Sequence, residues 1–197
     1  MVEWSMKKKH IITVAGRPGS GKSTTSKMLA ECLGYERFSS GDFFRLLGRE
    51  RGMDVKSANI DAEKGQSDID AIVDQKLRDL GEQSDNMVID SRTAWHWIPN
   101  SFKVYLNLDI HIAVKRILSK IEPERLKSEN IPDNPVEYEK ALDERYASES
   151  RRYQALYNID PSQLSNYDLV IDTATNDPKQ VIKIIIDAYE RWLGDVN

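Results

Sequence analysis

A glycine-rich segment near the start of the chain carries the residue types of a phosphate-binding loop. Residues 16–23 read Gly-Arg-Pro-Gly-Ser-Gly-Lys-Ser and satisfy the pattern G-x-x-x-x-G-K-[ST]. Glycine lets backbone N–H groups turn toward phosphate oxygens without a Cβ in the way, and the following helix adds the positive end of its dipole. The pattern predicts binding of ATP or GTP through Gly16, Arg17, Pro18, Gly19, Ser20, Gly21, Lys22, Ser23 and Thr24.

Two residues of this loop are candidates for direct roles in phosphate chemistry. Lys22 is expected to reach the β- and γ-phosphates, and the Ser23 hydroxyl is expected to bind Mg²⁺. The loop alone is compatible with a kinase, an ATPase or a nucleotide-regulated switch, so the remaining residues must decide among these classes.

Two further segments combine charge with the start or end of an element. Ser40, Asp42 and Arg45 share one helical turn, where a hydroxyl and a guanidinium suit a phosphate dianion, although a capping serine beside a solvated arginine is the alternative. Asp90 and Arg92 directly follow an apolar run. A carboxylate there can bind Mg²⁺ or its water, although two charges after a strand are weak support by themselves.

A long helix places two arginines and a carboxylate on one face. Arg145, Glu149 and Arg152 are spaced so that the carboxylate can orient both guanidinium groups, although an exposed, salt-bridged helix is the alternative. Lys115 and Arg116 end an earlier helix and could equally be solvated.

Acidic and aromatic side chains offer weaker candidates for recognition of a base. Asp70 and Asp74 are an i, i+4 pair for which a solvated face is the alternative, and residues 95–97, expected on a loop, could stack on a base or simply pack. His96 has no second ligand at metal-binding spacing in its segment.

The elements that position these residues alternate between strand and helix. Strands are expected at residues 10–15, 35–38, 87–90, 103–108 and 169–171, and helices at 23–33, 41–51, 67–80, 110–121, 135–156 and 178–193. Residues 52–66 read as irregular, and the charged, proline-rich residues 122–135 read as a mobile loop. This order predicts an α/β fold with a five-stranded parallel, doubly wound sheet that binds ligands at the carboxyl ends of its strands.

The composition fits one domain without a broad charged surface. The chain has 197 residues, with 28 Lys and Arg against 32 Asp and Glu, so it lacks the overall positive field of nucleic-acid or membrane binders. Cys32 is the only cysteine and is expected to be a buried core thiol in a reducing compartment. With no apolar run long enough for a signal peptide or membrane span, we expect a cytoplasmic monomer.

Nearly the whole chain resembles the nucleoside-monophosphate kinase family, and within it the cytidylate kinases of the short archaeal type. Residues 39–45 resemble the family segment S-S-G-D-x-x-R, residues 90–92 resemble D-G-R, and residues 145–152 resemble R-x-x-x-D-x-x-R. The resemblance implies a three-layer P-loop fold with a core at residues 9–40, 84–121 and 135–197. It also implies a helical acceptor-binding insert at about 41–83 and a small lid at about 122–134.

The resemblance also assigns roles to residues. It implies acceptor binding by Ser40, Asp42, Arg45, Asp70, Arg92 and Arg152, and catalysis by Lys22, Arg116, Arg145 and Arg152, with Ser23 and Asp90 at the metal. Residues 172–175 resemble the loop against which the family rests adenine. Thr93 stands where many bacterial relatives carry the aspartate that reads cytosine, so the way in which this chain would read the base stays open.

The expected function is transfer of the γ-phosphoryl group of ATP to a nucleoside monophosphate, CMP or dCMP, with Mg²⁺ as cofactor. Partners would be these nucleotides, without nucleic acid or membrane. The alternatives are a kinase for AMP, UMP or a non-nucleotide acceptor, or a non-catalytic module gated by nucleotide.

Overall fold

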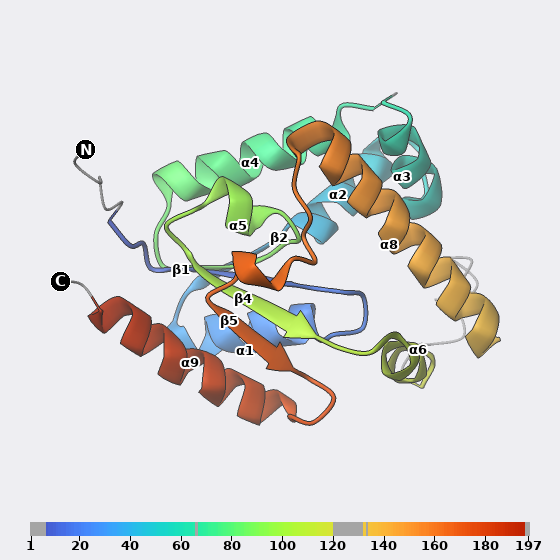
Figure 1. The fold of residues 1–197 in the computed structure, drawn as a ribbon. Coiled ribbons are helices and arrows are strands. Elements are labelled where there is room, and N and C mark those ends of the chain that lie inside the picture. The colour runs from blue at the N-terminus through green and yellow to red at the C-terminus, as the bar shows by residue number, and fades with distance from the viewer. Residues whose placement is uncertain (1–6, 66, 120–131, 133, 196–197) are drawn as a thin grey trace.

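Five parallel strands form a single sheet at the centre of the molecule (Figure 1). The computed structural model describes residues 7–65, 67–119, 132 and 134–195. In chain order the strands are β1 (Ile11–Gly16), β2 (Glu36–Ser39), β3 (Met87–Asp90), β4 (Phe102–Asn107) and β5 (Leu169–Asp172). Their order across the sheet is β2-β3-β1-β4-β5. Strand β1 therefore lies in the middle, and the loop that follows it begins between β3 and β4. The predicted α/β fold with a parallel sheet is confirmed.

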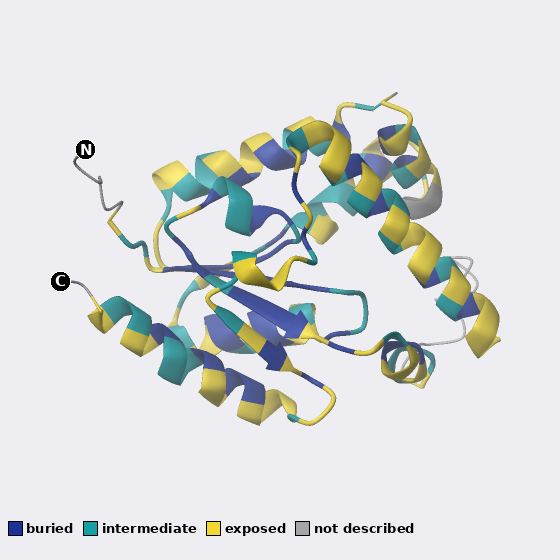
Figure 2. Ribbon diagram, viewed as in Figure 1, coloured by how far each residue is buried: buried dark blue, intermediate teal, exposed yellow. Residues whose placement is uncertain are grey.

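Helices cover both faces of the sheet and complete three layers. On one face lie α1 (Lys22–Leu33) and α9 (Pro178–Gly194), and on the other lie α2 (Ser40–Glu50), α4 (Ile69–Gln83) and α5 (Ala94–Trp97). The period of two along a strand divides β3 between these layers: Val88 packs toward α1 and α9, whereas Met87 and Ile89 pack toward α4. The three inner strands β1, β3 and β4 are mostly buried, as the dark blue of Figure 2 shows.

A long helix runs along the side of the molecule toward which the strands point. This helix, α8 (Pro135–Tyr157), leads from α6 (Ile110–Leu118) toward α4 in Figure 1. It begins where the sequence predicts, because Asn134 Oδ1 accepts hydrogen bonds from the N–H groups of Val136 and Glu137 and Pro135 occupies the first turn. Buried Tyr138 and Leu142 pack it against α6, so α8 can project side chains over the carboxyl ends of the strands.

The structure corrects three local expectations. Residues expected to be irregular contain α3 (Val55–Glu63), whose start is capped by Asp54 through a 2.7 Å bond from Ser57 N–H. Cys32 is exposed, since the buried side of α1 is formed by residues such as Leu29 and Ala30. The aromatic segment expected on a loop is the short helix α5.

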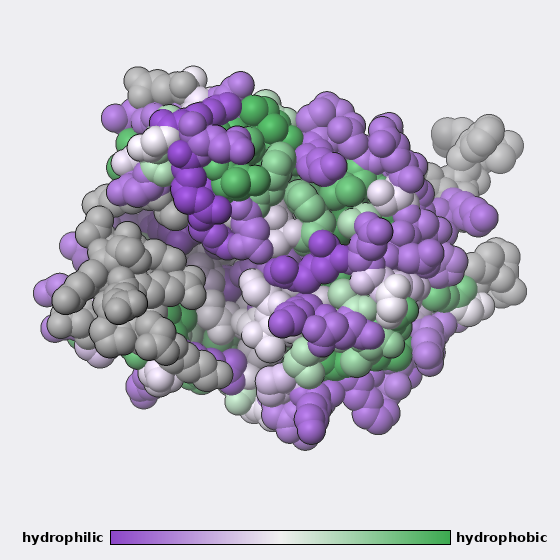
Figure 3. All heavy atoms as spheres, turned by 180° about the vertical axis from the view of Figure 1, so that it is seen from behind, coloured by the Kyte–Doolittle hydropathy of each residue, from purple (hydrophilic) through white to green (hydrophobic). Residues whose placement is uncertain are grey.

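The expected lid lies almost entirely outside the described residues. Within the described residues, no helix combines the length and apolar character that a membrane span requires. On the face shown in Figure 3, hydrophobic residues gather in separate patches between hydrophilic side chains.

Candidate active site

The loop between β1 and α1 has the backbone geometry of a phosphate cradle. Gly16 has φ +144°, and a Cβ there would lie 2.4 Å from the carbonyl oxygen of Leu106 on β4, so only glycine fits. Gly21 caps α1 in the left-handed region with φ +92°. Ser20 is 1% exposed, and its Oγ has no hydrogen-bond partner among the described residues. A buried hydroxyl without a partner in this loop is what a bound anion would satisfy.

The Lys22 side chain hydrogen-bonds to backbone oxygens of the phosphate-binding loop. Its Nζ donates to the carbonyl oxygens of Gly16 (2.8 Å) and Arg17 (3.0 Å). Burial and the charge of Arg92 together lower the pKa of Lys22 to about 8, against the opposing effects of Asp90 and Glu149. A triphosphate would reverse this balance, because its negative charge favours the ammonium form.

A hydroxyl and a carboxylate meet beside the cradle at the end of β3. Asp90 is 5% exposed, and its Oδ2 accepts a 2.9 Å hydrogen bond from Ser23 Oγ. These two hard oxygens fit Mg²⁺, which commonly takes one or two protein oxygens and completes its shell with water and substrate phosphates. The described residues contain no group of three or more His, Cys, Asp or Glu residues able to hold a metal by themselves.

Three arginines gather around one buried carboxylate, and we call Arg92, Arg145, Glu149 and Arg152 the arginine group. Glu149 is 3% exposed; its Oε1 accepts a 3.1 Å hydrogen bond from Arg145 Nε, and its Oε2 pairs with Arg92 Nη1. Burial acts to raise the pKa of Glu149, but the charges of Arg92, Arg145 and Arg152 outweigh it and lower that pKa. The group therefore holds three positive charges around one negative charge.

The arginine group is incompletely hydrogen-bonded. The buried Nε atoms of Arg92 and Arg152 and the Oε2 of Glu149 lack an aligned hydrogen bond to any described residue. The Nε of Arg152 lies 2.7 Å from Asp70 Oδ2, and this contact is an ion pair without hydrogen-bond geometry. Buried donors normally have partners, so the Nε–H of Arg92 is available to a phosphate oxygen, whereas that of Arg152 faces Asp70.

The structure decides which of two neighbouring arginines faces the site. Arg152 is 6% exposed and pairs with Asp70 of α4. Arg151 keeps a 65% exposed side chain and binds Glu63 of α3 at 2.8 Å. The buried face of α8 therefore carries Glu149 and Arg152, as the spacing predicts, while Arg151 stays on the outer face.

The acceptor segment lies beside Asp90, but its arginine points elsewhere. Ser40 Oγ donates to the Asp90 carbonyl oxygen at 3.3 Å, while Ser39 caps α2 by accepting from Asp42 N–H. Arg45 pairs with Asp42 on its own helix, and no described contact joins it to the arginine group. Burial acts to raise the pKa of Asp42, but the hydrogen bond and charge of Arg45 outweigh it and lower that pKa.

Arg116 lies beside the loop between β5 and α9. Its Nη2 donates to the carbonyl oxygen of Thr173 at 2.5 Å, in the loop between β5 and α9. Among the described residues it makes no contact with Arg145 or Arg152. Arg116 thus joins the loop at residues 172–175, which the sequence associates with adenine, rather than the arginine group.

Neither acidic residue of the α4 pair lies on a solvated face. Asp74 is 6% exposed and accepts hydrogen bonds from Trp97 Nε1 (2.9 Å) and from the Tyr157 hydroxyl. Burial raises its pKa, although both bonds oppose the rise. Burial also raises the pKa of Asp70, against the charge of Arg152. Asp70 therefore forms an ion pair with Arg152, whereas Asp74 hydrogen-bonds to the aromatic residues Trp97 and Tyr157.

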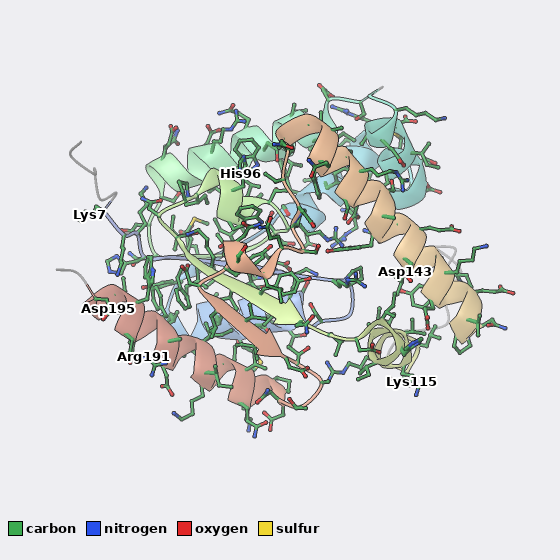
Figure 4. All side chains as sticks on the ribbon, in the orientation of Figure 1. Lys7, His96, Lys115, Asp143, Arg191 and Asp195 are labelled. Carbon is green, nitrogen blue, oxygen red and sulfur yellow. The ribbon has the colours of Figure 1, made fainter. Side chains whose placement is uncertain are left out.

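The aromatic segment packs as a unit beneath the long helix. The Trp97 ring lies 5.1 Å from that of Tyr157, and the guanidinium of Arg78 stacks on Trp97 at 4.0 Å. Figure 4 shows His96 on α5 near α4. Thr93, which precedes α5, is 4% exposed and donates its N–H to Ser91 Oγ at 3.2 Å, so this position supplies no carboxylate to a base.

One link between the cradle and α8 was absent from the sequence-based predictions. Arg17 stacks on the Tyr146 ring at 4.5 Å and lies 3.9 Å from Asp143, whose place on α8 is marked in Figure 4. The second residue of a phosphate-binding loop is unconstrained by the motif, so only the position of α8 reveals this contact.

Fold and site together define a P-loop kinase. A protein-family model described as an AAA domain matches residues 12–137. Among curated proteins, the cytidylate kinase of Haloarcula marismortui is 38% identical over 188 residues, covering 94% of this chain and 92% of its own. That of Methanocaldococcus jannaschii is 38% identical over 182 residues, covering 91% and 97%. The chain belongs to the cytidylate kinase family and is a nucleoside-monophosphate kinase.

Solved structures of low sequence identity share the fold. The shikimate kinase of Acinetobacter baumannii, solved with shikimate, has a TM-score of 0.60 at 17% identity and covers 98% of both chains. A gluconokinase of Sinorhizobium meliloti has a TM-score of 0.59 at 13% identity and covers 96% of both. These likenesses support the three-layer P-loop architecture and nothing finer.

Proposed function

We propose that this enzyme transfers the γ-phosphoryl group of ATP to CMP or dCMP. The observation that carries the proposal is the arginine group: three guanidinium groups surround buried Glu149, the buried Nε of Arg92 has no hydrogen-bond partner among the described residues, and Arg92 and Arg145 lie close enough to lower the pKa of Lys22 in the cradle. Two phosphate-bearing substrates repel each other, and this excess of positive charge offsets their repulsion. The sequence identity between this chain and the cytidylate kinases supports cytosine as the base of the acceptor.

Catalysis in this proposal consists of positioning and charge neutralisation. The cradle and Lys22 hold the triphosphate, while Arg92, Arg145 and Arg152 bring the acceptor phosphate to its far end. No general base is required, because a phosphate dianion is already nucleophilic near neutral pH. Mg²⁺, held by Ser23 and Asp90, would neutralise phosphate charge when bound.

Base and donor recognition involve other residues. Asp70 is our candidate for contact with the acceptor because it lies 2.7 Å from Arg152. Arg116 and the loop at residues 172–175 would face the adenine of ATP, with Arg116 held by the Thr173 carbonyl. Cytosine would then be read by groups other than the side chain at position 93.

A panel of acceptors tests the proposal. ADP release from ATP is followed in a coupled assay with CMP, dCMP, UMP, AMP and a non-nucleotide acid, and we expect kcat/KM to be highest for CMP or dCMP. Strong preference for AMP would overturn the base assignment. Tight ATP binding without transfer to any acceptor would instead support a nucleotide-gated module.

Replacement of Arg45 separates acceptor binding from chemistry. Arg45→Ala is expected to raise the acceptor KM by roughly 10- to 100-fold, the loss of one charge-assisted hydrogen bond, with a smaller effect on kcat. For this role Arg45 must exchange its Asp42 partner for the acceptor phosphate. Arg49→Ala, an exposed position on the same helix, is the matched control. Unaltered acceptor kinetics in the Arg45 variant would argue against the assignment.

A further inference from the structure

An arginine that no motif includes lies against the candidate metal carboxylate. Arg37 is on β2, and its Nη2 lies 3.5 Å from Asp90 Oδ2, the same oxygen that accepts from Ser23. Its Nη1 lies 3.8 Å from Asp42 Oδ2. Arg37 therefore stands between a residue assigned to the metal and a residue assigned to the acceptor segment.

The pairing of β2 with β3 explains how this side chain reaches the end of the sheet. Ser39 is in register with Asp90 and Arg37 with Val88, so Arg37 lies two residues before the level of the carboxylate and on the same face of the sheet. Two residues of strand span roughly 6.6 Å, a distance that an extended arginine side chain covers. Phe38, between them, faces the opposite layer.

A hydrogen bond to α1 holds the guanidinium of Arg37 in position. Arg37 Nε donates a 2.8 Å hydrogen bond to Ser26 Oγ, and Ser26 is fully buried on α1. Ser26 in turn donates to the carbonyl oxygen of Ser23 at 3.2 Å. The helix that carries the metal-binding hydroxyl thus also holds the positive charge beside the metal-binding carboxylate.

We propose that Arg37 is the resident counter-ion of Asp90, neutralising this buried carboxylate when no divalent cation is bound and thereby weakening cation binding at Ser23 and Asp90. A buried carboxylate needs a positive partner, and Arg37 supplies one in the metal-free enzyme. Since Mg²⁺ binding would place a second cation beside the guanidinium, the two compete for Asp90. Asp42 gives Arg37 another carboxylate to pair with. This inference rests on the metal assignment in the proposed function.

The test measures how strongly Mg²⁺ promotes nucleotide binding, without turnover. The Kd of ADP is determined by calorimetry in EDTA and in saturating Mg²⁺, and the ratio of the two values reports the coupling between metal and nucleotide. Arg37→Gln removes the charge and keeps a side-chain amide that can donate to Ser26. We expect the ratio to rise roughly three- to tenfold, because a competing charge is gone.

Three controls isolate the effect. Arg37→Lys keeps the charge and should leave the ratio near the wild-type value. Arg51→Gln breaks another arginine–aspartate pair, between Arg51, whose side chain is 31% exposed, and Asp68. This variant should leave the ratio unchanged. Asp90→Asn should abolish the gain when combined with Arg37→Gln.

The outcomes separate the inference from the proposal on which it rests. An unchanged or smaller ratio in Arg37→Gln would overturn the counter-ion role, since a purely structural arginine produces that result. If Mg²⁺ fails to promote ADP binding even in the wild-type protein, the metal assignment itself is wrong.

Discussion

Replacing Lys22 by alanine is expected to lower kcat by roughly a hundred- to a thousandfold while leaving the fold intact. The two hydrogen bonds of the Lys22 ammonium go to carbonyl oxygens of its own loop, so its loss removes hydrogen bonds only within that loop. Steady-state kinetics and a thermal unfolding curve measure the two parts of this expectation. Lys27→Ala, an exposed position on the same helix, is the matched control and should behave like the wild type.

The lowered pKa of Lys22 adds a pH dependence to this prediction. The pKa is about 8 in the free enzyme, and the charged form is the one that binds phosphate. Therefore kcat/KM for ATP should fall as the pH rises through about 8, whereas kcat should hold to higher pH because bound triphosphate keeps the amine charged. An identical pH profile for both parameters would contradict the environment described for Lys22.

Replacing Glu149 is expected to have the largest effect on stability. Glu149→Ala leaves Arg92 and Arg145 without their buried partner, and breaking a buried pair in this way typically costs about 3–5 kcal/mol. Urea unfolding at pH 7 measures the loss. Glu144→Ala removes an exposed carboxylate from the same helix and should cost less than about 1 kcal/mol.

The titration of Glu149 supplies a second readout of its role. Because the folded state lowers its pKa, the ionised carboxylate contributes stability above its unfolded pKa of about 4.3, and this contribution is lost as the pH falls through the folded value. The wild-type protein should therefore lose stability more steeply below about pH 4.3 than Glu149→Gln does. Parallel acid limbs would show that the arginine group does not hold Glu149 ionised.

The cradle and the order of elements are predictable because their causes are local. The motif from Gly16 to Ser23 demands one backbone geometry, and the β-branched run before it favours a buried strand, which β1 is along its whole length. Helix α3 also has a local signal, since Asp54 accepts a hydrogen bond from the N–H of Ser57 three residues later and so caps the helix start.

Other features depend on tertiary packing and could not be predicted. Spacing places Arg145, Glu149 and Arg152 on one face of α8, but only the position of α8 against α3 and α4 buries Glu149 and Arg152, while Arg145 stays exposed. Asp74 is buried for the same reason, through Tyr157 and Trp97. Arg37 is an exposed residue of the edge strand β2, and only the pairing of β2 with β3 brings its side chain to Asp90.

The central claim is that one site holds two nucleotides with their phosphates end to end. The most direct measurement is inhibition by adenosine and cytidine joined 5′ to 5′ through five phosphates. We predict competition with both ATP and CMP, and binding at least about a hundredfold tighter than that of ATP alone, because the second half binds within the same molecule. Competition with ATP but indifference to CMP would contradict the two-anion site.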